Sequence, residues 1–145
     1  MKEYVFQDAR LIYEKMDLIH FFWRWFYIPS FKVTTMMRLV QYVETNKSFG
    51  CKLFRAWGGE KLLALKYLRI CNKYNCFLPH TTIIGPGVSF PHNFPIVINP
   101  AARIGNNCII HPNVLIGTDR GKTGAPEIGN NCFLGDGCKD RKSVV

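Results

Sequence analysis

His92 is the titratable side chain in this sequence whose surroundings point most directly to chemistry. It stands in the stretch FPHNFPIVINP, residues 90–100, between Pro91 and Pro95, in an otherwise mostly apolar run. An imidazole can accept or donate a proton near neutral pH, which makes histidine a common acid or base in enzymes. Whether His92 can act in this way depends on where the fold places it.

The six cysteines are the next group that could do chemistry, as metal ligands. No C-x-x-C pair occurs among them, and the four residues between Cys71 and Cys76 match no common metal site. Cys108, Cys132 and Cys138 each take the same position of a repeat that is described below. We therefore interpret these three as small packing residues and predict no metal site.

The segment GTDRGKT, residues 117–123, looks like a phosphate-binding loop. Its spacing is G-x3-G-K-T, one residue short of that motif, and no helical pattern follows it. The motif works only when the full loop leads into a helix whose N-terminus faces the phosphates. We therefore reject a nucleoside triphosphate site.

Composition and charge set the broad class of protein. The chain has 145 residues, 48% of them hydrophobic, which allows one domain with an appendage. Of its formal net charge of +9, residues 1–77 carry +7 and residues 78–145 carry +2. A basic half could meet nucleic acid, an anionic membrane or a phosphorylated substrate. Among these partners we expect no nucleic acid.

The apolar, aromatic run LIHFFWRWFYI, residues 18–28, is too short to span a membrane. It has 11 residues, whereas a spanning helix needs roughly 20. Charges also interrupt residues 1–17, so no signal peptide is visible and we expect a cytoplasmic protein. Two interpretations of residues 18–28 stay open: a helix that packs on its neighbours or on another subunit, or a peripheral membrane contact with its rings in the headgroup zone.

The second half of the chain is a repeat of six residues. The residue after the recurring apolar position is often glycine, and the residue four positions after it is small or β-branched. The recurring apolar residues are Leu78, Ile84, Phe90, Ile98, Ile104, Ile110, Ile116, Ile128 and Leu134. This hexapeptide pattern is typical of a parallel β-helix, in which three short strands make one coil of about 18 residues.

The six-residue period is broken at two places. From Phe90 to Ile98 the step is eight, so two extra residues lie within residues 92–95. Between Ile116 and Ile128 the phase continues, but position 122 is a lysine, so we expect residues 118–127 to leave the coil as a polar excursion. Irregular segments on a regular scaffold often carry function, and the first break contains His92.

The division of the chain follows from these patterns. Helical spacing over residues 1–17, 31–47 and 59–75 predicts an α-helical N-terminal region, residues 1–77. The repeat predicts a β-helix domain, residues 78–139. Residues 140–145 do not continue the repeat, and we expect an irregular, truncated tail there.

Residues 78–139 resemble the hexapeptide-repeat acetyltransferases of the serine acetyltransferase family, and look closest to members encoded with capsule and lipopolysaccharide genes. The inserted histidine segment, the IVINP that follows it, and then IHPNVLIG and GAPEIG carry the resemblance. It implies a mainly β fold, a left-handed parallel β-helix of about three coils preceded by an α-helical region. It also implies a homotrimer that transfers acetyl from acetyl-CoA to a hydroxyl of L-serine or of a sugar.

The resemblance also assigns roles to residues of this chain. It implies that His92 is the general base, because a hydroxyl is hardly ionised at neutral pH and must lose its proton to attack a thioester. Backbone N–H groups of the turns could then stabilise the oxyanion. The implied substrate-binding residues are His111 and Asn93. The implied acetyl-CoA-binding residues are Gly117, Gly135 and Asp136.

Three positions depart from the serine-specific members of that family. These members place an aspartate immediately before the histidine, where this chain has Pro91, and a second aspartate at the position of Phe77. A second site histidine corresponds to Ala125. These differences favour an acceptor other than serine, such as a sugar hydroxyl. The alternative is a truncated, non-catalytic β-helix that serves as an assembly module.

Overall fold

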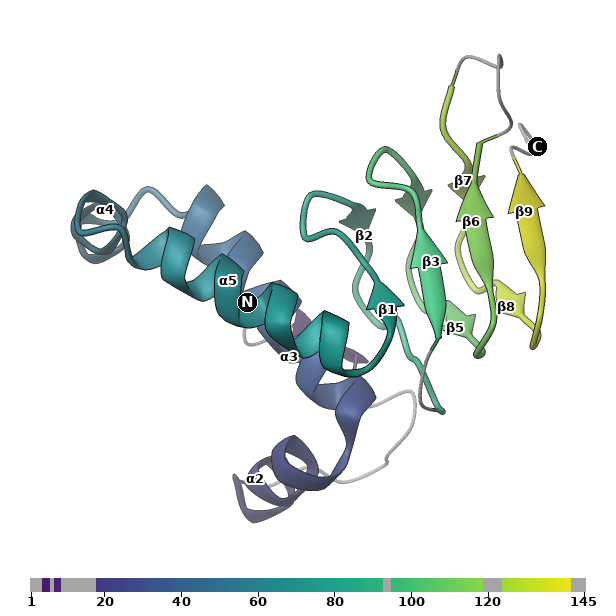
Figure 1. The fold of residues 1–145 in the computed structure, drawn as a ribbon, viewed down its shortest axis with the longest axis horizontal. Coiled ribbons are helices and arrows are strands. Elements are labelled where there is room, and N and C mark those ends of the chain that lie inside the picture. The colour runs from purple at the N-terminus through teal and green to yellow at the C-terminus, as the bar shows by residue number, and fades with distance from the viewer. Residues whose placement is uncertain (1–3, 6, 9–17, 93–94, 119–123, 142–145) are drawn as a thin grey trace.

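The computed structural model describes residues 4–5, 7–8, 18–92, 95–118 and 124–141. A group of helices packs at one end of a stack of short parallel strands (Figure 1). The helices are α2 (Leu18–Tyr27), α3 (Pro29–Thr45), α4 (Phe49–Ala56) and α5 (Gly59–Lys73). In the part of the chain that the structure describes, no helix is both long and apolar enough to cross a membrane.

Local sequence signals explain where these helices begin. Pro29 occupies the first turn of α3, where its fixed φ is favourable and its missing N–H is not needed. Ser48 caps α4, because its side chain accepts a hydrogen bond from the Cys51 N–H. Gly58, at φ 75°, separates α4 from α5. The predicted helices over 31–47 and 59–75 correspond to α3 and α5, whereas α4 was not predicted.

The strands form the three faces of a parallel β-helix. They are β1 (Cys76–Phe77), β2 (Ile83–Ile84), β3 (Ile96–Ile98), β4 (Arg103–Ile104), β5 (Ile109–Ile110), β6 (Leu115–Gly117), β7 (Glu127–Ile128), β8 (Phe133–Leu134) and β9 (Lys139–Arg141). The first face contains β1, β3, β6 and β9, and the second face contains β2, β4 and β7. The third face contains β5 and β8, preceded by a bridge between Ser89 and Ile109. Three coils are therefore complete, and β9 starts a fourth.

The pairing register confirms both predicted breaks of the period. Strands β3 and β6 pair residues that are 18 positions apart, which is one regular coil. Strands β1 and β3 pair residues 20 positions apart, so the coil that contains His92 holds two extra residues. Strands β4 and β7 pair residues 24 positions apart, so the excursion adds six. Its residues 119–123 lie outside the described residues.

The repeated apolar and small positions face the core, as the pattern predicts. The buried residues of the repeat are Leu78, Thr82, Ile84, Val88, Phe90, Ile98, Ala102, Ile104, Cys108, Ile110, Val114, Ile116 and Leu134. The same core continues into Val33, Met37 and Val40 of α3 and Tyr67 of α5. The helical region thus closes one end of the β-helix.

The packing interpretation of the cysteines is correct for Cys108 and wrong for Cys138. Cys108 is fully buried. Cys132 is half-buried, and Cys138 is exposed. Cys132 and Cys138 are less buried because both lie in the third coil. Among the described residues, only β9 stacks on that coil.

The strands reach slightly beyond the predicted bounds of the repeat. Strand β1 pairs with β3 from Cys76 onward, two residues before Leu78. Strand β9 continues the register to Arg141, inside the segment expected to be irregular, and pairs Asp140 with Ile116. A carboxylate therefore takes the place of an inward aliphatic residue there. Residues 142–145 lie outside the described residues.

A buried ion pair joins the helical region to the first coil. The Arg38 Nε of α3 donates to the Asp8 carboxylate at 2.9 Å, and both side chains are buried. The same guanidinium donates to the carbonyls of Ile84, at 2.7 Å, and Gly85, at 2.6 Å. Asp8 also accepts from the Val88 N–H at 2.9 Å. This network connects α3, the segment around Asp8 and the first coil.

Candidate active site

The inserted segment lies at the corner where the third face turns into the first. Successive coils place His92, then His111, then Gly135 and Asp136 at this corner, which we call the histidine corner. The stacking follows from the backbone, since the His111 N–H donates to the Leu134 carbonyl, immediately before Gly135, at 2.9 Å. Residues predicted from separate motifs are therefore brought together.

The two imidazoles of the histidine corner are in contact. The His92 and His111 ring centroids are 5.4 Å apart with an interplanar angle of 66°, an edge-to-face arrangement. On its other side the His111 ring meets Phe133, with centroids 4.9 Å apart. His92 is exposed, whereas His111 is half-buried between the two rings. His92 is thus open to a substrate from solvent and is contacted by a ring that its neighbours hold in place.

The prolines around His92 fit an inserted, outward-turning segment. Pro91 and Pro95 have no N–H, so neither leaves a ladder donor unpaired. The Pro95 carbonyl accepts from the Asn113 N–H at 2.6 Å, which joins the end of the insertion to the coil above. The insertion therefore begins and ends at one corner of the β-helix, and its residues 93–94 lie outside the described residues.

Asp136 is fixed by Asn113, a residue that no motif of the sequence marks as a site residue. The Asn113 side-chain N–H donates to the Asp136 carboxylate at 3.0 Å. Asn113 has a left-handed backbone, with φ 60°, at a tight turn where asparagine is tolerated. The exposed carboxylate of Asp136 can accept further hydrogen bonds from a ligand that carries hydroxyl or amide groups.

The two predicted glycines lie at different places. A side chain built on Gly135 would meet only the Phe133 ring, at 3.8 Å, so the backbone at the histidine corner can be approached by a ligand. Gly117 is similarly open but ends β6, where it pairs with Arg141. It therefore lies at the far end of β6 from Asn113, and the structure does not bring it to the histidine corner.

The remaining predicted or family-related positions add no acid or base to the described site. Asn93 lies outside the described residues. Phe77 projects outward from β1 with 57% of its side chain exposed. Pro91 and Ala125 are half-buried. None of Phe77, Pro91 and Ala125 has a side chain that can form an ion pair with an imidazole.

A groove lies over the corner between the second and third faces and reaches Phe133 on the third face. It has a volume of about 660 Å³ and includes Phe133, whose ring contacts His111. Its other lining residues are Gln7, Pro86, Asn106, Asn107, Ile109, Asn131 and Cys132. The groove thus combines side-chain amides with apolar groups, a combination suited to a chain-like ligand that carries amide bonds.

The amides of the groove are held by stacked turns. The Asn107 side chain donates to the Asn131 side-chain carbonyl one coil above, at 3.3 Å. Both residues have left-handed backbones, with φ 55° and 57°. Gly105 is required for this stacking, because a Cβ there would lie 2.6 Å from the Asn130 amide oxygen. Among the described residues, no group of three or more His, Cys, Asp or Glu side chains could hold a metal ion.

No protein-family model and no curated protein matches the chain by sequence. Solved structures do match it by fold. The serine acetyltransferase of Neisseria gonorrhoeae in complex with serine is 20% identical, with a TM-score of 0.69 over 95% of this chain and 53% of that one. The soybean serine acetyltransferase apoenzyme is 22% identical, with a TM-score of 0.68 over 96% of this chain and 55% of that one.

A third match contains a ligand. The serine acetyltransferase of Brucella abortus in complex with coenzyme A is 18% identical, with a TM-score of 0.68 over 95% of this chain and 52% of that one. The chain spans about half the length of the solved structures it matches. At these identities the matches show the fold, which is the predicted one: an α-helical region followed by a left-handed parallel β-helix like that of the serine acetyltransferases.

Proposed function

We propose that this protein is an acetyl-CoA-dependent O-acetyltransferase with His92 as the general base. One observation carries the proposal: in the coil that holds two extra residues, His92 is exposed and its ring packs against His111. The fold likeness to serine acetyltransferases supports it, and so does the coenzyme A bound to one of these enzymes. The kinship with capsule-associated members and the cytoplasmic location stay predictions.

The proposed chemistry is a proton transfer coupled to an acyl transfer. His92 takes the proton of the acceptor hydroxyl while the hydroxyl oxygen attacks the acetyl carbonyl carbon. The C–O bond forms and the C–S bond of the thioester breaks. The departing thiolate of coenzyme A then takes up from His92 the proton that came from the acceptor hydroxyl. A backbone N–H at the corner would stabilise the oxyanion that forms between these steps.

His111 and Asp136 would position the acceptor. The His111 ring contacts the His92 ring, so it limits the orientations that the His92 ring can take. The ring nitrogens of His111 can form hydrogen bonds with an acceptor that carries several hydroxyl groups, and so can the carboxylate of Asp136, which the family resemblance assigned to acetyl-CoA. A sugar satisfies this description. L-Serine would also need an anionic partner for its ammonium group; Phe77, Pro91 and Ala125 supply none, which leaves the exposed carboxylate of Asp136 as the acid at the histidine corner.

The groove that reaches Phe133 is the proposed site for the pantetheine arm of acetyl-CoA. That arm is a flexible chain with two amide groups, which the asparagines of the groove can hydrogen-bond. Phe133 lines the groove and its ring contacts His111, so a thioester that extended past Phe133 would lie near His92. The open backbone of Gly135 leaves room for this approach. Gly117, at another corner, would contact a different part of the ligand.

The homotrimer is also proposed. Each face of the β-helix exposes an apolar residue: Phe77 and Val97 on the first, Ile83 on the second and Phe133 on the third. Outward aliphatic and aromatic side chains on a sheet lose unfavourable contact with water when copies of the chain pack together.

A coenzyme A release assay tests the proposed function. Acetyl-CoA is incubated with the full chain and either L-serine or a panel of neutral sugars, and the products are separated by chromatography. We expect acceptor-dependent release of coenzyme A, with a sugar preferred over serine. The absence of release with every acceptor would contradict the proposal.

The missing aspartates at Phe77 and Pro91 and the missing histidine at Ala125 favour a second candidate, a non-catalytic β-helix that serves as an assembly module. Calorimetry separates it from the enzyme. An assembly module would bind no acetyl-CoA, whereas the proposed enzyme would bind it with saturable heat even before a suitable acceptor is known.

A further inference from the structure

Helix α2 has two apolar faces, and its inner face is covered by the rest of the protein. Phe21 stacks edge to face on Phe31 of α3, with ring centroids 5.3 Å apart. Ile28, at the end of the helix, packs into the same small cluster, and Trp25 packs against the main core. These contacts explain the position of α2 and account for one side of its apolar surface.

The outer face of α2 is more aromatic than the inner face, and it is exposed. Its residues follow the three- and four-residue spacing of one helical stripe, and between 57% and 79% of each is exposed. They are Ile19, Phe22, Trp23, Phe26 and Tyr27, which we call the α2 aromatic face. Water-exposed rings in one continuous stripe are costly, and such surfaces mark interaction sites.

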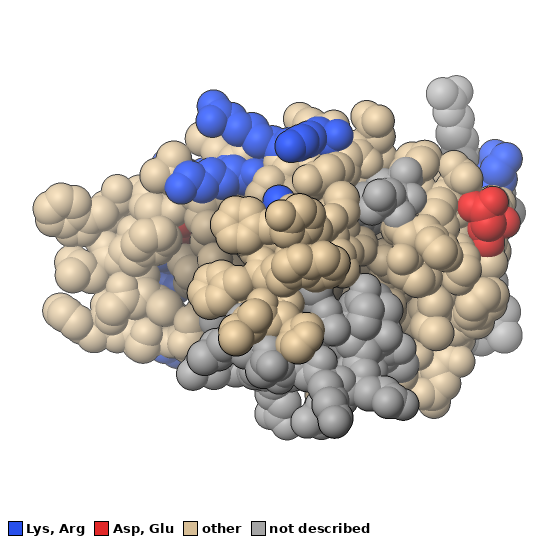
Figure 2. Space-filling view, turned by 90° about the horizontal axis from the view of Figure 1, so that it is seen from below, with Lys and Arg blue, Asp and Glu red and all other residues tan. Residues whose placement is uncertain are grey.

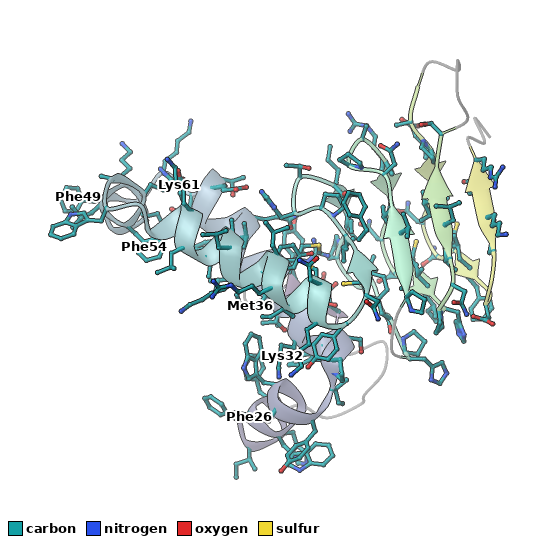
Figure 3. All side chains as sticks on the ribbon, in the orientation of Figure 1. Phe26, Lys32, Met36, Phe49, Phe54 and Lys61 are labelled. Atoms are coloured by element: carbon teal, nitrogen blue, oxygen red, sulfur yellow. The ribbon has the colours of Figure 1, made fainter. Side chains whose placement is uncertain are left out.

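Lys32 lies beside α2, and further basic residues lie on α5, which packs against α3. Lys32 lies in the first turns of α3, directly after α2, as Figure 3 shows. Helix α5 exposes leucines and basic residues side by side: Lys61, Leu62, Leu65, Lys66, Leu68, Arg69 and Lys73. The view from the side of α2 shows Lys and Arg side chains along one border of a broad uncharged surface (Figure 2). Residues 18–28 contain no Asp or Glu.

We propose that the α2 aromatic face docks this protein on the surface of an anionic lipid bilayer. Tyr and Trp rings favour the headgroup region of a bilayer, and an amphipathic helix binds there with its apolar face buried. Lysine and arginine beside it are attracted to anionic headgroups. The described helices cannot cross the bilayer, so α2 would lie along its surface.

Charge also argues against a second copy of the chain as the partner of this face. Residues 1–77 carry a net charge of +7. Two copies joined through α2 would bring two such basic regions together, and like charges at an interface oppose association. An anionic bilayer has the complementary charge. This inference concerns where the protein is held and does not depend on the proposed acetyl transfer.

Vesicle sedimentation tests the proposal with the full chain. Vesicles of phosphatidylcholine alone are compared with vesicles that contain about 30% phosphatidylglycerol. We expect binding to the anionic vesicles that weakens several-fold as NaCl rises from about 0.05 M to about 0.5 M. Trp23→Ser combined with Phe26→Ser should lower the bound fraction about tenfold or more.

The matched control removes two exposed rings elsewhere in the helical region. Phe49→Ser combined with Trp57→Ser changes residues of α4 and of its C-cap that are 82% and 85% exposed. We expect this variant to bind vesicles like the unchanged protein. Equal binding to both vesicle types would overturn the proposal, and so would equal loss in the two double variants.

Fluorescence gives a second readout that does not rely on the α2 double variant. The chain has three tryptophans, so replacing Trp25 and Trp57 with Phe leaves Trp23 as the sole reporter on the α2 aromatic face. On anionic vesicles its emission should shift to the blue and be quenched by brominated lipids. No shift would contradict the proposal. A change of oligomeric state in the α2 double variant without lipid would assign this face to a second copy instead.

Discussion

At the scale of single residues, the candidate site depends on contacts across coils. His92 and His111 lie in different repeats, and Phe133 lies in a third, yet the three rings form one continuous row. His92 could be singled out from the sequence because two extra residues break the period around it. Phe133 and Asn113 could not be singled out from the sequence. Which residues they contact in the adjacent coil depends on the excursion, because it sets the register between the second and third coils at 24 positions.

His111 can be tested without disturbing the row of rings. His111→Phe keeps a ring between His92 and Phe133 but removes both ring nitrogens. We expect it to raise the KM for the acceptor about tenfold, with a smaller fall in kcat, because a hydrogen bond to the bound acceptor is lost. His111→Ala should lower kcat as well, since the His92 ring then loses its support. Steady-state kinetics of both variants distinguishes the two effects, and equal kinetics in all three proteins would refute both roles.

The reaction rate of each cysteine with an alkylating reagent should depend on how deeply the neighbouring coils bury it. Burial raises the pKa of the Cys108 thiol, whose Sγ donates to the Gly129 carbonyl at 3.1 Å. A raised thiol pKa means less thiolate, the reactive form, at neutral pH. Iodoacetamide should therefore modify the exposed Cys138 about tenfold faster or more, as peptide mass spectrometry would show. Comparable rates for the two would mean that the third coil does not cover Cys108.

At the scale of elements, the hexapeptide spacing predicts the coils well because it reports a steric requirement. Inward residues such as Ile98 and Ile116 fill the narrow interior of the β-helix, where few types of side chain fit. Their six-residue spacing is therefore visible in the sequence. Helix α4 lacks such a constraint. Phe49 and Trp57, at its two ends, are exposed, so its apolar residues do not mark a core-facing side. Its start is set instead by the Ser48 cap, a short-range signal without a period.

The junction between α3 and the first coil should be the most sensitive polar contact in the fold. Arg38→Met leaves the buried Asp8 carboxylate without its partner, and breaking a buried pair costs about 3–5 kcal/mol. We expect the free energy of unfolding to fall by this amount in a urea titration.

The double variant provides the control for this junction. Arg38→Met combined with Asp8→Leu removes both charges, so it should be less destabilised than the sum of the two single variants. Strict additivity in the double-mutant cycle would mean that the two side chains do not interact in solution.

At the scale of the whole molecule, the apolar residues on the outside of the β-helix predict association. Sedimentation velocity should give a mass about three times that of the 16.7 kDa chain. Val97→Asp places a charge beside Phe77, its register partner on the first face, and should shift the protein toward monomer. A monomer in the unchanged protein, or a trimer that Val97→Asp leaves intact, would contradict the proposed role of this face.

The whole molecule would then combine a catalytic site on the β-helix with a membrane-binding surface on α2. The stacked coils would bring acceptor, thioester and His92 together, while the α2 aromatic face would hold this arrangement at an anionic membrane. The helical region is linked to the coils through a common core. The catalytic site and the membrane-binding surface can nevertheless be changed independently, since none of the residues that define the histidine corner belongs to α2.

The most direct test of the account is the rate of coenzyme A release by His92→Ala, with the acceptor that supports the fastest release by the unchanged protein. General-base catalysis contributes about 10²–10⁴-fold, so the rate should fall by at least about 100-fold, with an unchanged circular dichroism spectrum. His20→Ala, a change in the exposed part of α2, is the matched control and should keep the full rate. A His92→Ala variant as active as the unchanged protein would contradict the account.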